Sequence, residues 1–215
     1  IQAAWDNAGG LSGFATFFEI TGCRAEVRVK AGTLQAGGLL GHGSNGVIQN
    51  SGAAALAVFP RTINGPLFPE YNEVVAESGS EYAGGIAGQL QWAVVRNCFS
   101  RGTVNAQSNA GGLVGSVTDG SITGCFSTAK VPLFGVDYES KGGLLGFSWG
   151  CAVSSSTADR CVVGGYLNVG GFAGLLSGNV SSCMAIDCRV TGVSRVGGFV
   201  GVLGNAPSTG YQVTN

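Results

Sequence analysis

The stretch from Gly111 to Val131, GGLVGSVTDGSITGCFSTAKV, decides the fold because its opening motif recurs along the chain. A Gly-Gly-apolar-x-Gly motif begins at seven positions: Gly9, Gly37, Gly84, Gly111, Gly142, Gly170 and Gly197. Successive motifs are separated by 28, 47, 27, 31, 28 and 27 residues. A period of roughly 20–50 residues is typical of a solenoid, a propeller or another repeat array. The one long interval indicates an insertion, which spans residues 53–81.

The repeats agree beyond their glycines. Cys23, Cys98 and Cys125 each follow the first glycine of their motif by 14 residues, and Ser51 and Ser156 hold the same offset. The segments between the motifs are short alternating runs bounded by Gly, Asn, Ser and Asp, which predicts short β-strands. No segment combines a sustained helical period with capping residues, so we expect almost no helix.

These features predict an all-β chain that forms a single domain over residues 1–215. We expect a parallel β-helix (β-solenoid) of about seven coils, with roughly 27–31 residues per coil, one long inserted loop and a new coil near each motif. A propeller blade needs ~40–50 residues, which is longer than this repeat. A β-sandwich would not place cysteine at a fixed offset.

The composition excludes some classes of partner. The formal net charge is −1 and only 11% of the residues are charged, so the chain lacks the basic field that attracts nucleic acid or anionic lipid. No apolar run reaches the ~18 residues of a membrane span, so we expect no membrane insertion. High hydrophobicity combined with few charges argues against disorder.

We expect no catalytic residue, no cofactor and no metal site. His42 is the only histidine, and the chain has neither an H-E-x-x-H nor a G-x-S-x-G motif. The stretch GHGSNG at 41–46 is followed by VIQNS rather than by a helix, unlike a dinucleotide site. Asp159 and Asp187 hold the same offset, with Arg160 and Arg189 nearby, which favours a surface ion-pair ladder over a catalytic carboxylate pair.

The seven cysteines raise the question of disulfides. Cys98 and Cys125 share an offset in consecutive coils, and Cys161 and Cys188 align in the same way. Stacked coils ~4.8 Å apart would place their Cα atoms within disulfide range. Disulfides within these two pairs are therefore possible, and the alternative is a ladder of buried free thiols that pack as small apolar groups.

Two further features are candidate sites of interaction or modification. The insertion, Ala53–Glu81, is the least solenoid-like part of the chain, and a long loop on a rigid scaffold commonly carries binding. Its candidate partner-binding or ligand-binding residues are Phe59, Arg61, Phe68, Tyr71 and Glu73. The alternative is a loop that only covers an apolar patch. Asn179 begins an N-glycosylation sequon.

The repeat unit resembles the GLUG repeat, whose pattern runs roughly GGLVG…G-x-I-x-N-C-Y-S-x-G-x-V. The segments Gly84–Val104 and Gly111–Val131 carry the closest resemblance. GLUG repeats occur in large bacterial surface and secreted proteins, including adhesin-like proteins. The resemblance therefore implies an extracellular or cell-surface stalk or adhesive module, and it carries over no catalytic residue.

We expect a non-enzymatic structural or adhesive β-solenoid, a stalk or filament module. It would engage protein partners or copies of itself through coil ends, lateral faces and the inserted loop. The seventh repeat stops short at Asn215, so we expect continuation into further coils or a partner subunit. One alternative is a carbohydrate-binding or carbohydrate-active β-helix that uses Trp92, Trp149 and Tyr166, which burial of both tryptophans would exclude. Another is a spacer without activity of its own.

Overall fold

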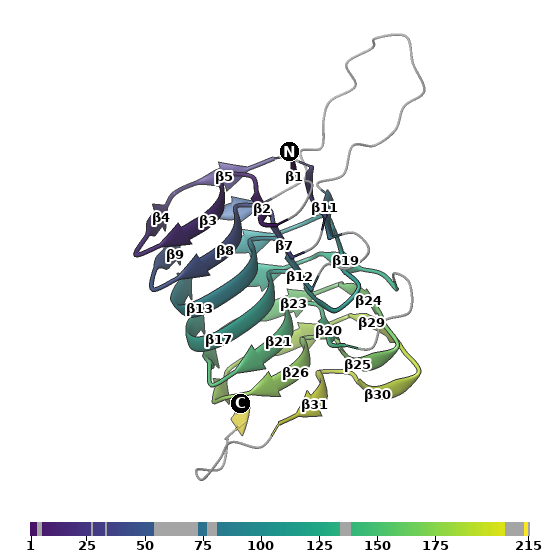
Figure 1. The fold of residues 1–215 in the computed structure, drawn as a ribbon. Coiled ribbons are helices and arrows are strands. Elements are labelled where there is room, and N and C mark those ends of the chain that lie inside the picture. Colours follow the sequence, from purple (N-terminus) through teal and green to yellow (C-terminus); the bar gives the residue numbers. More distant parts are fainter. Residues whose placement is uncertain are drawn as a thin grey trace, which may run out of the picture.

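The computed structural model describes residues 1–3, 6–26, 28–32, 34–53, 73–76, 81–133, 139–204 and 213–214. These residues form 32 short strands and no helix, so none forms a helix that could cross a membrane. Every strand pairing among them is parallel. Figure 1 shows the strands stacked as successive coils, from purple at the N-terminal end to yellow at the C-terminal end. The predicted all-β parallel solenoid is confirmed.

Each coil passes through four parallel sheets, here called A, B, C and D. Sheet A contains β1 (Gln2–Ala3), β6 (Val29–Ala31), β11 (Glu73–Ala76), β15 (Thr103–Asn105), β19 (Lys130–Val131), β24 (Val162–Gly164) and β29 (Arg189–Thr191). Sheet B contains β2 (Ala8–Gly9), β7 (Gln35–Gly37), β12 (Tyr82–Gly84), β16 (Asn109–Gly111), β20 (Lys141–Gly142), β25 (Leu167–Gly170) and β30 (Ser194–Gly197).

Sheet C is the largest. It contains β3 (Ser12–Thr16), β8 (Leu40–Ser44), β13 (Ala87–Arg96), β17 (Val114–Thr123), β21 (Leu145–Trp149), β26 (Ala173–Ser177) and β31 (Val200–Leu203), with β4 (Glu19–Thr21), β9 (Val47–Gln49), β22 (Ala152–Ser154), β27 (Val180–Ser181) and β32 (Val213–Thr214). Sheet D contains β5 (Arg24–Ala25), β10 (Gly52–Ala53), β14 (Phe99–Ser100), β18 (Phe126–Ser127), β23 (Thr157–Asp159) and β28 (Met184–Ile186). The described residues make about six turns, close to the seven predicted.

The core consists of ladders of apolar side chains that hold one repeat position in successive coils. The third motif residue is at most 1% exposed in five consecutive coils: Leu39, Ile86, Leu113, Leu144 and Phe172. The next position is fully buried in the same coils: Leu40, Ala87, Val114, Leu145 and Ala173. Burial of one such large side chain contributes about 1.5–3 kcal/mol. Because each ladder is covered by the coils on both sides, the repeat is stable only as a stack.

The three glycines of the motif are explained by close backbone contacts at the corner between sheets B and C. A Cβ on Gly84 would lie 2.0 Å from the carbonyl oxygen of Ala87, within the same turn. A Cβ on Gly85 would lie 2.3 Å from the carbonyl oxygen of Gly112 in the next coil, and one on Gly88 would lie 2.7 Å from that of Gly41 in the preceding coil. The corner is therefore too tight for any side chain, which is why the motif recurs.

The predicted insertion is only partly described. Its residues 54–72 and 77–80 lie outside the described part of the chain. Strand β11 falls within the same segment, where its backbone pairs Val74 with Val29 of β6 and with Val104 of β15. Residues 73–76 therefore belong to a regular coil in sheet A.

Candidate functional site

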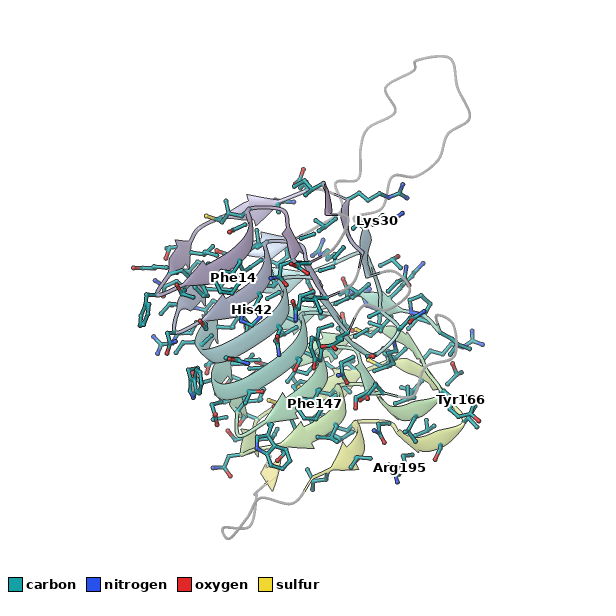
Figure 2. All side chains as sticks on the ribbon, in the orientation of Figure 1. Phe14, Lys30, His42, Phe147, Tyr166 and Arg195 are labelled. Atoms are coloured by element: carbon teal, nitrogen blue, oxygen red, sulfur yellow. The ribbon has the colours of Figure 1, made fainter. Side chains whose placement is uncertain are left out.

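Two ladders of outward side chains flank the glycine corner between sheets B and C. The residue two positions before each motif is polar in all seven repeats: Asn7, Gln35, Tyr82, Asn109, Ser140, Asn168 and Arg195. The residue five positions after the first glycine forms the second ladder: Phe14, His42, Gln89, Ser116, Phe147, Leu175 and Val202. Figure 2 labels Phe14, His42 and Phe147 along this second ladder.

The two ladders face each other because the corner turns sheet C back toward sheet B. A Cβ on Gly88 would lie 2.9 Å from the Cβ of Gln35. Across the corner, the side-chain amide of Gln35 donates a hydrogen bond to the Oε1 atom of Gln89 at 3.1 Å. The glycine motif therefore does more than close a turn, because it brings two rows of side chains together on the outside of the solenoid.

A hollow of about 310 Å³ opens between the ladders and is here called the polar groove. It lies where the second ladder has its smallest side chain, at Ser116 between Gln89 and Phe147. Its lining residues are Glu81, Tyr82, Gln89, Ser108, Asn109, Ser116, Thr118, Glu139 and Phe147. The groove thus combines hydroxyl, amide and carboxylate groups with the aromatic rings of Tyr82 and Phe147.

The wall of the groove on the side of β8 is held by hydrogen bonds and ring stacking. The Nδ1 atom of His42 lies 3.0 Å from the Oε1 atom of Gln89, the same oxygen that accepts the bond from Gln35. The ring of Phe14 stacks on His42 with 5.2 Å between centroids. These contacts use the carbonyl side of the Gln89 amide and leave its NH₂ group as a donor at the groove.

Asn109 and Ser116 bring unpaired polar groups to the bottom of the groove. Asn109 is 6% exposed, and its Oδ1 atom accepts a hydrogen bond from the backbone N–H of Ser140 at 3.1 Å. Its amide NH₂ has no acceptor among the residues that the structure describes. Ser116 is 3% exposed, and within the same part of the chain its hydroxyl has no hydrogen-bond partner. Neither atom is among the fully buried side-chain atoms without a partner, so both open into the hollow, where a polar ligand can reach them.

The rim of the groove is acidic. Glu81 and Glu139 are both exposed. Burial raises the pKa of the Tyr82 hydroxyl, as do the negative charges of Glu81 and Glu139 and a hydrogen bond to Glu81. Both carboxylates are therefore close enough to affect the ionisation of the same Tyr82 hydroxyl. None of the nine lining residues is basic, so the groove carries a negative potential.

The cysteine pairs are stacked as predicted, but they are not bonded. All seven cysteines are free thiols, so the possible disulfides Cys98–Cys125 and Cys161–Cys188 are not formed. The thiols instead donate to backbone carbonyl groups, as Cys98 does to Arg96 at 3.2 Å. Hydrogen bonding to Cys98 and burial both raise the pKa of Cys125. The alternative of a plain thiol ladder describes this structure.

The predicted ladder of Asp159 and Asp187 is wrong by one position. Asp159 pairs in register with Ile186, so Asp187 lies opposite Arg160 instead. Arg160 binds Asp159 of its own coil, with 2.9 Å between Nη2 and Oδ2. The ion pair is therefore a local surface contact. Among the described residues, no three His, Cys, Asp or Glu side chains are grouped so that they could hold a metal ion.

The three aromatic residues proposed as a sugar platform do not form one surface. Trp92 and Trp149 are 58% and 42% exposed, so the burial that would exclude the carbohydrate alternative is not found. Both tryptophans belong to sheet C, whereas Tyr166 precedes β25 of sheet B and lies well apart from Phe147 in Figure 2. Only Trp149 adjoins the groove, because it pairs in register with Thr118.

Of the remaining candidate residues, the side chain of Asn179 lies in the described part of the chain and those of the candidates in the insertion do not. Asn179 is exposed, next to β27. The candidate loop residues fall outside the described side chains: Phe59, Arg61, Phe68, Tyr71 and Glu73. Sequence reasoning missed the groove, although the signal was present: a polar residue stands two positions before every motif.

Comparison with known proteins identifies the repeat. A family model of the GLUG motif matches residues 79–105 and 106–131. The chain contains GLUG repeats. Searches among curated proteins and among solved structures find no match. The two GLUG motifs supply seven of the nine residues that line the groove: Glu81, Tyr82, Gln89, Ser108, Asn109, Ser116 and Thr118. The groove is therefore built mainly from the two coils that match the GLUG pattern.

Proposed function

We propose that this chain is a non-enzymatic structural module of an extracellular or cell-surface protein, and that it works by end-to-end docking of β-solenoids. The resemblance to GLUG repeats of surface and secreted proteins supports the location. The docking is inferred from the strands β28 to β31 at one end of the solenoid. Apolar side chains are exposed there at repeat positions that are buried in the inner coils.

The comparison is direct because the same repeat position can be followed from coil to coil. Val169 of β25 is fully buried, whereas Val196, its register partner in β30, is 46% exposed. Phe172 is fully buried and stacks on Phe199, which is only half-buried. Among the residues that the structure describes, none covers the apolar surface of this coil, which favours a further coil as its partner.

The backbone at both ends of the sheets offers matching edges. Strands β28, β29, β30 and β31 are the last members of their sheets, and β1, β2, β3 and β5 are the last at the opposite end. Edge strands present unpaired N–H and C=O groups that can pair with another chain. The two ends of this solenoid carry the same repeat in the same parallel direction, so one copy can continue the sheets of another. Such a head-to-tail contact is heterologous and generates filaments.

Light scattering over a range of protein concentrations, with electron microscopy of the same samples, tests the proposal. We expect oligomers that grow end to end with concentration. Val196→Asp should abolish them, because it places a charge on the docking surface. Val162→Asp is the matched control, since Val162 is 40% exposed but lies within an inner coil. Wild-type protein that stays monomeric at every concentration would overturn the proposal, as would equal loss of assembly in both variants.

A further inference from the structure

We propose that the polar groove binds one sugar residue of a neutral or amino-bearing glycan. This inference goes beyond the docking function and does not depend on it, because the groove lies on a lateral face and within inner coils. It rests on four features of the groove: its unpaired donors, its carboxylate acceptors, the ring of Phe147 and its charge.

The donors come from the bottom of the groove. The NH₂ groups of Asn109 and Gln89 are directed there because the oxygen atom of each amide is held by a hydrogen bond, and the hydroxyl of Ser116 lines the same hollow. Asn109 and Ser116 are almost fully buried and lack partners for these groups among the described residues. Both donors open into the hollow, so a ligand that supplies acceptors replaces water as their hydrogen-bond partner.

The acceptors and the apolar contact come from the rim and the wall. The carboxylates of Glu81 and Glu139 can accept hydrogen bonds from the hydroxyl groups of a ligand. The half-buried ring of Phe147 offers an apolar surface beside them. A sugar ring has both kinds of surface, with hydroxyl groups that donate and accept around its edge and C–H groups on its faces. The arrangement therefore matches a sugar better than a purely apolar ligand.

The size and charge of the groove narrow the ligand further. A volume of 310 Å³ is at the lower end of the ~300–1,000 Å³ of small-molecule sites, which suits a single ring. Of its nine described lining residues two are acidic and none is basic, so uronic acids, sulfated sugars and phosphates would be repelled. A neutral sugar is accepted, and an amino sugar gains attraction from Glu81 and Glu139.

Isothermal titration calorimetry with defined tetrasaccharides tests the binding. The probes are neutral tetramers of glucose, mannose and galactose, the tetramer of glucosamine and the tetramer of galacturonic acid, at a pH where the glucosamine amine is charged. We expect at least one neutral tetramer and the glucosamine tetramer to bind, and the galacturonic acid tetramer not to bind. Glu81→Gln with Glu139→Gln should remove the preference for glucosamine.

A matched pair of variants locates the site. Ser116→Val removes the unpaired hydroxyl and narrows the groove, and the strand tolerates valine because Val202 holds the same ladder position. Ser121→Val is the control in the same strand, because Ser121 pairs in register with Val94 outside the groove. Ser116→Val should weaken binding about 10-fold or more, and Ser121→Val should leave it unchanged.

Three results would overturn the inference: no binding of any tetramer, tighter binding of the acidic tetramer, or equal effects of Ser116→Val and Ser121→Val. Light scattering of the Ser116→Val protein keeps the two proposals apart. Because Ser116 lies in an inner coil, its substitution should leave end-to-end assembly at the wild-type level. A loss of glycan binding alone then reports on the groove, and a loss of assembly alone reports on the coil ends.

Discussion

Gly171 and Gly198 hold the same position in consecutive coils but have opposite surroundings. A Cβ on Gly171 would lie 2.2 Å from the carbonyl oxygen of Gly198, whereas a Cβ on Gly198 would have no heavy atom of the described residues within 4 Å. The motif requires glycine at this position only when another coil lies on top. The second glycine of the motif therefore reports whether a coil is covered.

Alanine substitution at two equivalent glycines should have very different effects on stability. A Cβ on Gly112 would lie 2.0 Å from the carbonyl oxygen of Gly143, and the backbone of a packed coil cannot move away without loss of its ladder. Gly112→Ala should lower the free energy of unfolding by at least ~2 kcal/mol, and Gly198→Ala should change it by no more than ~0.5 kcal/mol. Urea unfolding of both variants measures the difference, and similar losses would contradict this account of the corner.

Gly198→Ala should nevertheless block end-to-end assembly. In a head-to-tail stack, the first coil of the next copy would cover Gly198 as the coil of Gly198 covers Gly171. The added methyl group would then meet a backbone carbonyl. A folded variant that stays monomeric while wild type assembles is the expected result in light scattering, and assembly at the wild-type level would argue against this mode of docking.

Trp92 occupies a left-handed backbone conformation at a ladder position that the first coil gives to another aromatic residue, Phe17, and that the neighbouring coils give to small polar residues. Its φ is +47°, and the same corner holds Asn45 at +53° and Asp119 at +56°. The left-handed region costs a bulky residue roughly 1–2 kcal/mol, and asparagine tolerates it better. Trp92→Asn should therefore raise the free energy of unfolding by about 0.5–1 kcal/mol in urea titrations. The reverse change, Asn45→Trp, is the control and should lower it, and a less stable Trp92→Asn protein would show that packing of the ring outweighs the strain.

Stability should fall at alkaline pH because of a buried thiol. Burial raises the pKa of Cys151 to about 12, with a further contribution from the charge of Asp119. Above the ordinary thiol pKa of ~8.5, the unfolded chain loses this proton while the folded chain keeps it, so the unfolded state is favoured as the pH rises from 9 toward 12. In this range, ionisation of the thiol in the unfolded chain lowers the free energy of unfolding by up to about 1.4 kcal/mol per pH unit.

Cys151→Ala should remove that part of the pH dependence. The substitution is compatible with the fold because Ala93 holds the same ladder position two coils earlier. Between pH 8 and pH 11, the free energy of unfolding should fall less steeply with pH in the variant than in wild type. Parallel curves would mean that Cys151 ionises as readily in the folded protein as in the unfolded chain.

The repeat predicted the architecture because each motif residue has a fixed contact in every coil. The seven glycine pairs and the stacking of Cys98 on Cys125 followed from offsets alone. The predicted alignment of Asp159 with Asp187 is wrong because an offset counts residues along the chain, whereas strand register depends on which backbone groups pair. Where coil lengths differ by a residue, equal offsets no longer mean equal ladder positions.

Other features depend on neighbours that the repeat pattern does not identify. Lys141 is fully buried at a position where adjacent coils have Ala110 and Val169, and its ammonium group donates to the backbone oxygen of Ala106. Gly165 makes room for it, because a Cβ there would lie 2.8 Å from the Cγ of Lys141. The polar groove likewise depends on the small size of one residue, Ser116, within a ladder of larger ones.

The most direct test of head-to-tail docking is chemical cross-linking between two native cysteines. Cys183 stands at the ladder position of Cys23, at the opposite end of the solenoid, and both are half-buried. Sheet D has six described strands where sheets A and B have seven, so in a head-to-tail stack the two cysteines would lie two coil spacings, ~9.6 Å, apart on neighbouring molecules. A short bis-maleimide should therefore join Cys183 of one copy to Cys23 of the next, as identified by mass spectrometry of the covalent oligomers, and Cys23→Ser should abolish this product. Oligomers that lack the Cys183–Cys23 link, or that form equally in Cys23→Ser, would contradict the docking of coil ends.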